Sequence, residues 1–89
     1  MPSIRTGVGT ILETKPYSIW TSSQGSNSIT VTLSQAYSNV KYALQASSDG
    51  SDALAVWYRV NGQNVTISAR NFYSSGLGQS GELIVYQTD

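Results

Sequence analysis

The sequence predicts an all-β fold, a small antiparallel β-sandwich of about six strands, formed by a single domain over residues 1–89. Several short segments alternate apolar and polar residues with a period of two, and none has the periodicity of a helix. Clusters of Gly, Ser, Asn and Asp separate these segments, as turns separate the strands of a sandwich. A chain of 89 residues suits one domain with a small core.

The clearest predicted element is a hairpin over residues 53–70, in which two β-rich runs flank Asn61-Gly62. This dipeptide predicts a two-residue type I′ turn, because both central residues of that turn take positive φ. The expected register pairs Val60 with Gln63, Arg59 with Asn64, Tyr58 with Val65, Trp57 with Thr66, Val56 with Ile67, Ala55 with Ser68 and Leu54 with Ala69.

The hairpin has one apolar and one polar face, because successive side chains point to opposite sides of a strand. The face expected to point to the core carries Leu54, Val56, Tyr58, Val65, Ile67 and Ala69. The opposite face carries Ala55, Trp57, Arg59, Asn64, Thr66, Ser68 and Arg70. A large indole among arginines, an amide and hydroxyls is the strongest functional signal in the chain.

The other elements are predicted from shorter patterns. Residues 3–13 alternate loosely and are expected to form the first strand, followed by a loop over 14–27 that Tyr17, Ile19 and Trp20 pin to the body. Strands are expected at 28–33, with Ile29, Val31 and Leu33 inward, and at 39–47. Residues 47–52 form a turn cluster and 71–80 a Gly- and Ser-rich loop, and the last strand covers 82–87.

Composition excludes several functions. The chain has neither cysteine nor histidine, which removes thiolate chemistry, the commonest zinc ligand and the commonest general base. No metal and no cofactor is therefore expected. The formal net charge is zero and 11% of residues are charged, which argues against nucleic-acid binding and against a polybasic membrane anchor. No apolar run could span a bilayer, and MPSIRTGVGT lacks the apolar region of a signal peptide.

Enzymatic activity is not expected. The serines have no histidine partner, and the carboxylates show no catalytic spacing: Glu13, Asp49, Asp52, Glu82 and Asp89. Asp49 and Asp52 share one turn, where Asp side chains ordinarily accept from local backbone N–H groups, and a calcium site would need more oxygen ligands. The two Gly-x-Gly segments are not phosphate loops, because neither opens a helix or carries a lysine.

The candidate ligand-binding residues are those of the polar hairpin face: Trp57, Arg59, Asn64, Thr66 and Arg70. Two interpretations of Trp57 stay open. The indole is either buried by a loop or a neighbouring subunit, or it is an exposed platform on which a sugar stacks while Arg and Asn bind its hydroxyls. The aromatic residues expected in loops (Tyr17, Trp20, Phe72 and Tyr73) are likewise either anchors or parts of a recognition loop.

From Ser28 onward the chain resembles the C-terminal modules of bacteriophage tail fibres and the related H-type lectin domains. The resemblance rests on Ile-Thr-Val-Thr-Leu at 29–33, the connection Gln-Ala-Tyr-Ser-Asn at 35–39 and the strand Val-Lys-Tyr-Ala-Leu-Gln-Ala at 40–46. A hairpin from Trp-Tyr-Arg at 57–59 to Val-Thr-Ile-Ser-Ala at 65–69 and a closing strand follow. That closing strand often carries a Trp in such modules, whereas here it reads Leu-Ile-Val-Tyr-Gln, so no sugar-binding residue is carried over.

The resemblance implies a six-stranded antiparallel sandwich in a homo-oligomer, a trimer, at a virion surface or in another extracellular setting. The expected function is a non-enzymatic tail-fibre or receptor-binding module that attaches to a host-surface glycan or protein. Its expected partners are that receptor and other virion proteins, without nucleic acid or membrane insertion. A structural virion protein, such as a capsid decoration or fibre-attachment module, is the main alternative, and a free lectin is the third.

Overall fold

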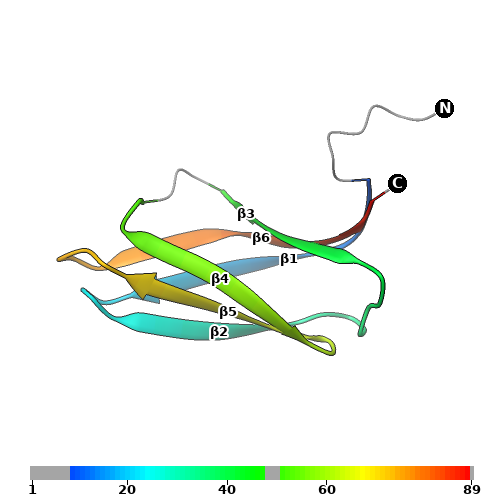
Figure 1. Cartoon of the computed structure of the whole chain (residues 1–89), viewed down its shortest axis with the longest axis horizontal. Coiled ribbons are helices and arrows are strands. Elements are labelled where there is room, and N and C mark those ends of the chain that lie inside the picture. The colour runs from blue at the N-terminus through cyan, green and yellow to red at the C-terminus, as the bar shows by residue number, and fades with distance from the viewer. Residues whose placement is uncertain (1–8, 48–50, 89) are drawn as a thin grey trace.

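Two three-stranded antiparallel sheets face each other (Figure 1). The structure is a computed structural model that describes residues 9–47 and 51–88, and this part of the chain contains no helix. The strands are β1 (Thr10–Thr21), β2 (Ser26–Thr32), β3 (Lys41–Ala46), β4 (Leu54–Asn61), β5 (Asn64–Asn71) and β6 (Leu77–Gln87). One sheet has the order β1-β6-β3 and the other β2-β5-β4. The predicted all-β class is confirmed.

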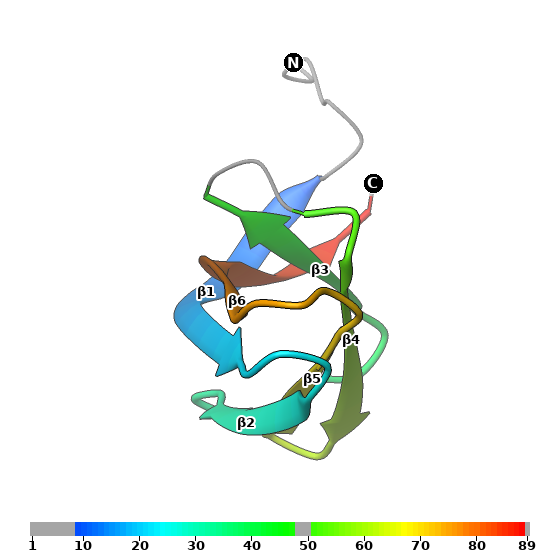
Figure 2. The ribbon, with the colours of Figure 1, turned by 90° about the vertical axis from the view of Figure 1, so that its left-hand side faces the viewer.

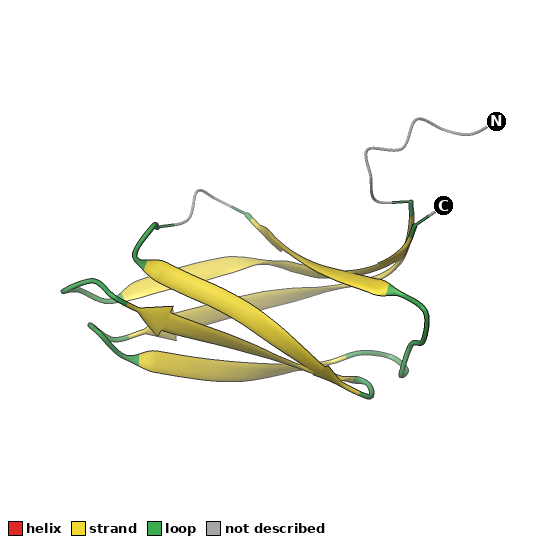
Figure 3. Cartoon of the chain, in the orientation of Figure 1, coloured by secondary structure: helices red, strands yellow, loops and turns green. Residues whose placement is uncertain are grey.

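Connections between the sheets give the sandwich two different ends (Figure 3). Only β4 and β5 are consecutive within one sheet, and every other connection crosses to the opposite sheet. The β1–β2, β3–β4 and β5–β6 connections meet at what we call the loop end, which faces the viewer in Figure 2. The β4–β5 turn and the β2–β3 connection lie at the opposite end, the hairpin end.

The core lies between the two central strands, β5 and β6. Val65 and Ile67 of β5 and Leu83 and Val85 of β6 have no exposed surface. Tyr17 of β1 and Leu33 complete the buried cluster. Ile29, Val31 and Val56 pack against the cluster as predicted. Tyr58, which was predicted on the core face, is instead 38% exposed, because it lies on the edge strand β4 and its ring packs beside Tyr42.

The hairpin register differs from the prediction by one residue in the turn. Asn61 pairs with Asn64, so Gly62 and Gln63 are the central turn residues. Gly62 has φ of 63° and Gln63 is not among the residues with positive φ, which is the pattern of a type II′ turn with Gly first. Leu33 explains the change, because its N–H donates to the Gln63 carbonyl at 2.7 Å and its carbonyl accepts from the Gln63 amide at 2.9 Å. Gln63 is thus held by β2 rather than by Val60.

The new register preserves the two predicted faces. Each partner moves by two positions: Trp57 lies opposite Ser68 instead of Thr66, and Arg59 opposite Thr66 instead of Asn64. Because side chains alternate with a period of two, a shift of two leaves every residue on its side of the sheet. The predicted pairing was wrong and the predicted division into faces was right.

The first strand lies later in the chain than predicted. β1 runs through most of the segment expected as a loop, and Tyr17 and Ile19 are buried at alternate positions along it. Pro16 is compatible with this strand because β1 is an edge strand, where a proline whose missing N–H faces outward costs no ladder hydrogen bond. Residues 3–8 of the predicted first strand (3–13) and residues 48–50 of the predicted turn cluster (47–52), with Asp49, lie outside the described residues.

β6 also begins earlier than predicted, at Leu77 instead of residue 82. Gly81 in β6 and Gly76 just before the strand resemble loop signals but have packing causes. A Cβ on Gly81 would collide with the backbone carbonyl of Gln45, and a Cβ on Gly76 would collide with the indole of Trp20. β2 and β3 lie within two residues of their predicted bounds.

Glu13 fastens the β2–β3 connection to β1 at the hairpin end. Its carboxylate accepts hydrogen bonds from the Tyr37 hydroxyl at 2.7 Å, the Ser34 hydroxyl at 2.8 Å and the Ser34 backbone N–H at 3.0 Å. These donors, above all Tyr37, lower the pKa of Glu13 below its ordinary value of 4.5. The ionised carboxylate therefore favours the folded chain.

Core and face assignments predict a graded series of variants. Ile67→Ala should lower the free energy of unfolding by about 2–4 kcal/mol, because Ile67 is completely buried. Val56→Ala, on the same face but only partly buried, should cost about 1–2 kcal/mol, and the outward Thr66→Ala less than about 1 kcal/mol. Urea unfolding measures all three, and a larger loss for Thr66→Ala than for Ile67→Ala would mean that the faces are reversed.

Acid should weaken the Glu13 contact. Because the folded pKa is lowered, the stabilisation is fully present above the unfolded pKa of Glu13 and is lost as the pH falls through the folded pKa. We expect wild type to exceed Glu13→Gln in urea stability at pH 7, with the difference shrinking toward pH 3. A difference that does not change between these pH values would mean that the charge of Glu13 has no part in it.

Candidate functional site

The outer face of the β2-β5-β4 sheet gathers all five residues singled out from the sequence. We call the outward residues of these strands the Trp57 face. The register sets Ser28, Ser68 and Trp57 in one rung across the sheet, and Thr30, Thr66 and Arg59 in the next. Trp57 and Arg59 are therefore consecutive on the outward side of β4, with hydroxyls beside both.

Trp57 is accessible in the folded chain. Its side chain is 50% exposed although it lies in the interior of β4. The interpretation that a loop of this chain buries the indole is therefore wrong for the residues that the structure describes. Two interpretations of the exposed indole remain open: it contacts a ligand, or it contacts a neighbouring subunit.

The five residues do not form one compact cluster. Arg59 lies opposite Thr66 near the middle of the face. Asn64 lies at the hairpin end, where its side-chain oxygen accepts from the Thr32 hydroxyl at 3.0 Å. Arg70 is six residues further along β5, or about 20 Å away at the rise of an extended strand. Only an extended ligand could contact both Asn64 and Arg70.

Phe72 extends this face toward the loop end and was not predicted as a site residue. Its ring is 64% exposed, and the guanidinium carbon of Arg70 lies 5.4 Å from the ring centroid, within the range of a cation–π contact. Alternation along β5 could have placed Phe72 near the face, but the sequence pattern assigned it to a loop. This contact holds the Arg70 guanidinium at the loop end of the Trp57 face.

The Trp57 face is positively charged and rich in hydroxyls. Arg59 and Arg70 are the charged residues at its outward positions, and the outward positions of β2 are Ser26, Ser28, Thr30 and Thr32. The hydroxyls of Ser28 and Ser68 lie 3.0 Å apart and bond each other. Two arginines without a carboxylate among these positions favour an anionic or strongly hydrogen-bonding ligand.

A buried asparagine orders the loop end. Asn71 has no exposed surface, and its amide donates to the carbonyls of Ser22 at 3.1 Å and Ser75 at 2.8 Å. Its side-chain oxygen accepts from the backbone N–H of Tyr73 at 2.7 Å. One side chain therefore ties the β1–β2 connection to the β5–β6 connection. Exposed aromatic residues beside it are held on a fixed loop.

The aromatic residues expected in loops separate into two groups. Tyr17 is buried, so it is a core residue, and its hydroxyl accepts from the amide of Gln79 at 2.8 Å. Trp20, Phe72 and Tyr73 are more than half exposed, with Trp20 at 61%. The expectation that Trp20 pins a loop is wrong, because it lies near the end of β1 on the outer side of the sheet.

Within residues 9–47 and 51–88, no group of three or more carboxylate, cysteine or histidine side chains is placed to hold a metal ion. The same residues contain no helix long and apolar enough to cross a membrane.

Comparison of the chain with protein-family models, with curated proteins and with solved structures gives no match. The interpretation of the site therefore depends on its own geometry and on the sequence resemblance described above.

Proposed function

We propose that this chain is a non-enzymatic receptor-binding module that attaches to a host-surface glycan through the Trp57 face. The observation that carries the proposal is the half-exposed indole of Trp57 in the interior of β4, on the polar outer face of its sheet. A free indole in that position exposes apolar surface to water with no folding benefit. It is well suited to stack against the C–H face of a sugar ring.

The neighbouring side chains define the ligand class. Arg59 presents a planar fork of donors next to Trp57, and Arg70 presents a second one toward the loop end. Hydroxyls of Ser28, Ser68 and Thr30 can exchange hydrogen bonds with sugar hydroxyls. An acidic polysaccharide, with a sugar ring on Trp57 and its anionic groups on the arginines, satisfies all these features.

The setting that we propose is a phage tail fibre, in which the module assembles as a homotrimer with other virion proteins. The resemblance of residues 28–89 to tail-fibre modules supports this setting. The alternative is a structural virion protein, such as a capsid decoration or fibre-attachment module. Ile11 and Leu12, exposed by 53% and 37% at the start of β1, suit both settings, because a neighbouring subunit would cover such apolar surface in either one.

Substitutions on the Trp57 face should separate binding from folding. On an array of acidic and neutral glycans, Trp57→Ala and Arg59→Ala should each weaken retention about tenfold or more, because buried Trp and Arg contacts dominate interfaces. Arg59→Ala should change the unfolding free energy by less than about 1 kcal/mol, since its side chain is exposed. Trp57→Ala, which removes a half-buried indole, should cost about 1–3 kcal/mol and leave the chain folded. Lys41→Ala, which removes a charge from the other sheet, is the matched control.

Glycan retention that survives both changes on the Trp57 face would place the ligand elsewhere. Loss of the oligomer in Trp57→Ala would instead identify the indole as a subunit contact and favour the structural virion protein. Arg59→Lys gives a third comparison, because it keeps the charge but loses the planar donor fork, so that retention should remain weakened.

Light scattering should show an oligomer with three times the 9.6-kDa mass of the chain. The physical reason is a small chain with little surface charge and exposed apolar residues at Ile11 and Leu12. Size-exclusion chromatography with light scattering at tens of micromolar measures this directly. A monodisperse monomer would contradict the trimer and favour a free lectin.

A further inference from the structure

Trp20 forms a second exposed platform on the opposite outer face, that of the β1-β6-β3 sheet. Tyr17, Ile19 and Thr21 are buried, so the alternating positions of Pro16, Ser18 and Trp20 point outward. The indole spans the backbone of β6 from Gly76 to Gly78, and a Cβ on Gly76 would collide with its Cζ2 atom. One side of the ring is thus supported by bare backbone, while 61% of the side chain remains exposed.

Polar side chains continue from this platform along the sheet. Ser18 pairs with Ser80 and their hydroxyls are 3.0 Å apart, while the next outward rung pairs Glu82 with Pro16 on one side and with Gln45 on the other. From Trp20 to Pro16 is four residues, or about 13 Å along the strand. The face therefore presents an indole, a pair of hydroxyls, and then a carboxylate beside an amide.

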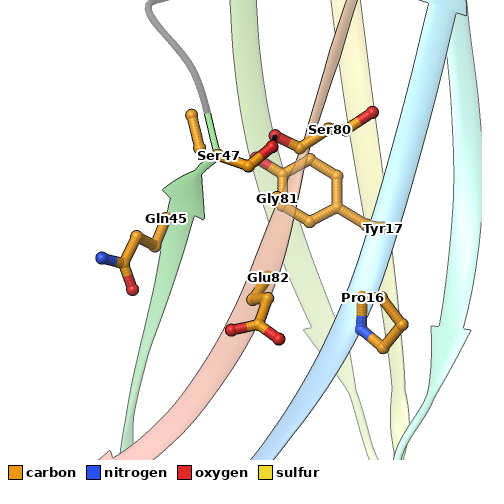
Figure 4. Close-up of a pocket in the computed structure, with 8 residues that line it drawn as sticks. Pro16, Tyr17, Gln45, Ser47, Ser80, Gly81 and Glu82 are labelled. Atoms are coloured by element: carbon orange, nitrogen blue, oxygen red, sulfur yellow. Dashed lines mark hydrogen bonds between the residues drawn. The ribbon is translucent and has the colours of Figure 1, made fainter.

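A hollow of about 590 Å³ lies where β3 ends (Figure 4). Ser47 borders it and is held in place by β6, because its backbone N–H and its hydroxyl donate to the Ser80 carbonyl at 2.9 and 3.0 Å. Its lining includes an aromatic ring, an amide, two hydroxyls and a carboxylate, those of Tyr17, Gln45, Ser47, Ser80 and Glu82. This volume is within the range of small-molecule sites, and polar side chains border the hollow.

We propose that this strip from Trp20 to Glu82 is a second carbohydrate site, specific for a short neutral oligosaccharide. A sugar ring stacks on Trp20, and the Ser18 and Ser80 hydroxyls contact the same or the next ring. The Glu82 carboxylate accepts from neighbouring hydroxyls and Gln45 both donates and accepts. A carboxylate at this position repels the acidic ligand proposed for the Trp57 face, so the two faces bind different sugars.

The chain provides a specific reporter for each face, because it has two tryptophans and each face carries one. Trp20 is the sole tryptophan of the Trp57→Phe variant, and Trp57 is the sole tryptophan of the Trp20→Phe variant. We would titrate full-length Trp57→Phe with neutral hexasaccharides of β-1,4-linked glucose, α-1,4-linked glucose and β-1,4-linked N-acetylglucosamine. At least one should change the Trp20 emission saturably at millimolar concentration or below.

Glu82→Gln in the same background should weaken this binding about tenfold, because a hydrogen bond to a charged group is replaced by a neutral one. Lys41→Gln, which removes a charge from the outer face of the same sheet at its other end, should leave the binding unchanged. Circular dichroism of each variant confirms that the fold is retained.

The proposal is overturned if no hexasaccharide changes the emission of Trp20 in the folded protein, or if Glu82→Gln binds as tightly as its parent. The Trp57 face is tested separately, by titrating Trp20→Phe with dextran sulfate, a polyanionic polysaccharide. Because each variant reports on one face, failure of the neutral-sugar site and failure of the acidic-glycan site give different results.

Discussion

The interaction on which both outer faces depend is the buried amide of Asn71. It satisfies two carbonyls, those of Ser22 and Ser75, and one N–H, that of Tyr73. Only a carboxamide has two donors and an acceptor in this arrangement, since an aspartate cannot donate and a leucine cannot bond at all. Each polar group left unpaired in a buried position costs about 1–3 kcal/mol, so this one side chain determines the path of the β5–β6 connection.

Both aromatic platforms are connected to that path. Just before Asn71, Arg70 points outward and meets Phe72, which extends the Trp57 face. Just after the connection, Gly76 lies against the indole of Trp20 on the opposite sheet. The β1–β2 and β5–β6 connections are thereby ordered without a ligand, and a preorganised surface loses less conformational entropy on binding than a flexible one.

Alternation of apolar and polar residues was sufficient to predict which side chains of the hairpin point outward. Trp57 and Arg59 point outward in any register that differs by two residues, so the candidate face was found although its partners were misassigned. The turn could not be predicted locally, because Gln63 bonds to Leu33, which is 30 residues away. β1 and the start of β6 were missed for a related reason. Pro16 is tolerated because β1 is an edge strand, and a glycine is required at position 76 because the indole of Trp20 lies against it. Both causes are contacts between distant parts of the chain, which a local sequence pattern does not contain.

The position of the threefold interface would decide which faces can bind. A closed threefold ring is heterologous, so each subunit contributes two different patches to it. If those patches were the two outer faces, Trp57 and Trp20 would both be buried. The sandwich also has two narrow sides, formed by β1 with β2 and by β3 with β4, where Tyr58 donates to the Tyr42 carbonyl at 3.3 Å. A ring closed through these sides leaves both outer faces in solvent, with Arg59 and Arg70 on one and Glu82 on the other. The proposed glycan sites and a trimer are compatible only in an arrangement that leaves both outer faces in solvent, since an exposed indole cannot serve as both a sugar platform and a subunit contact.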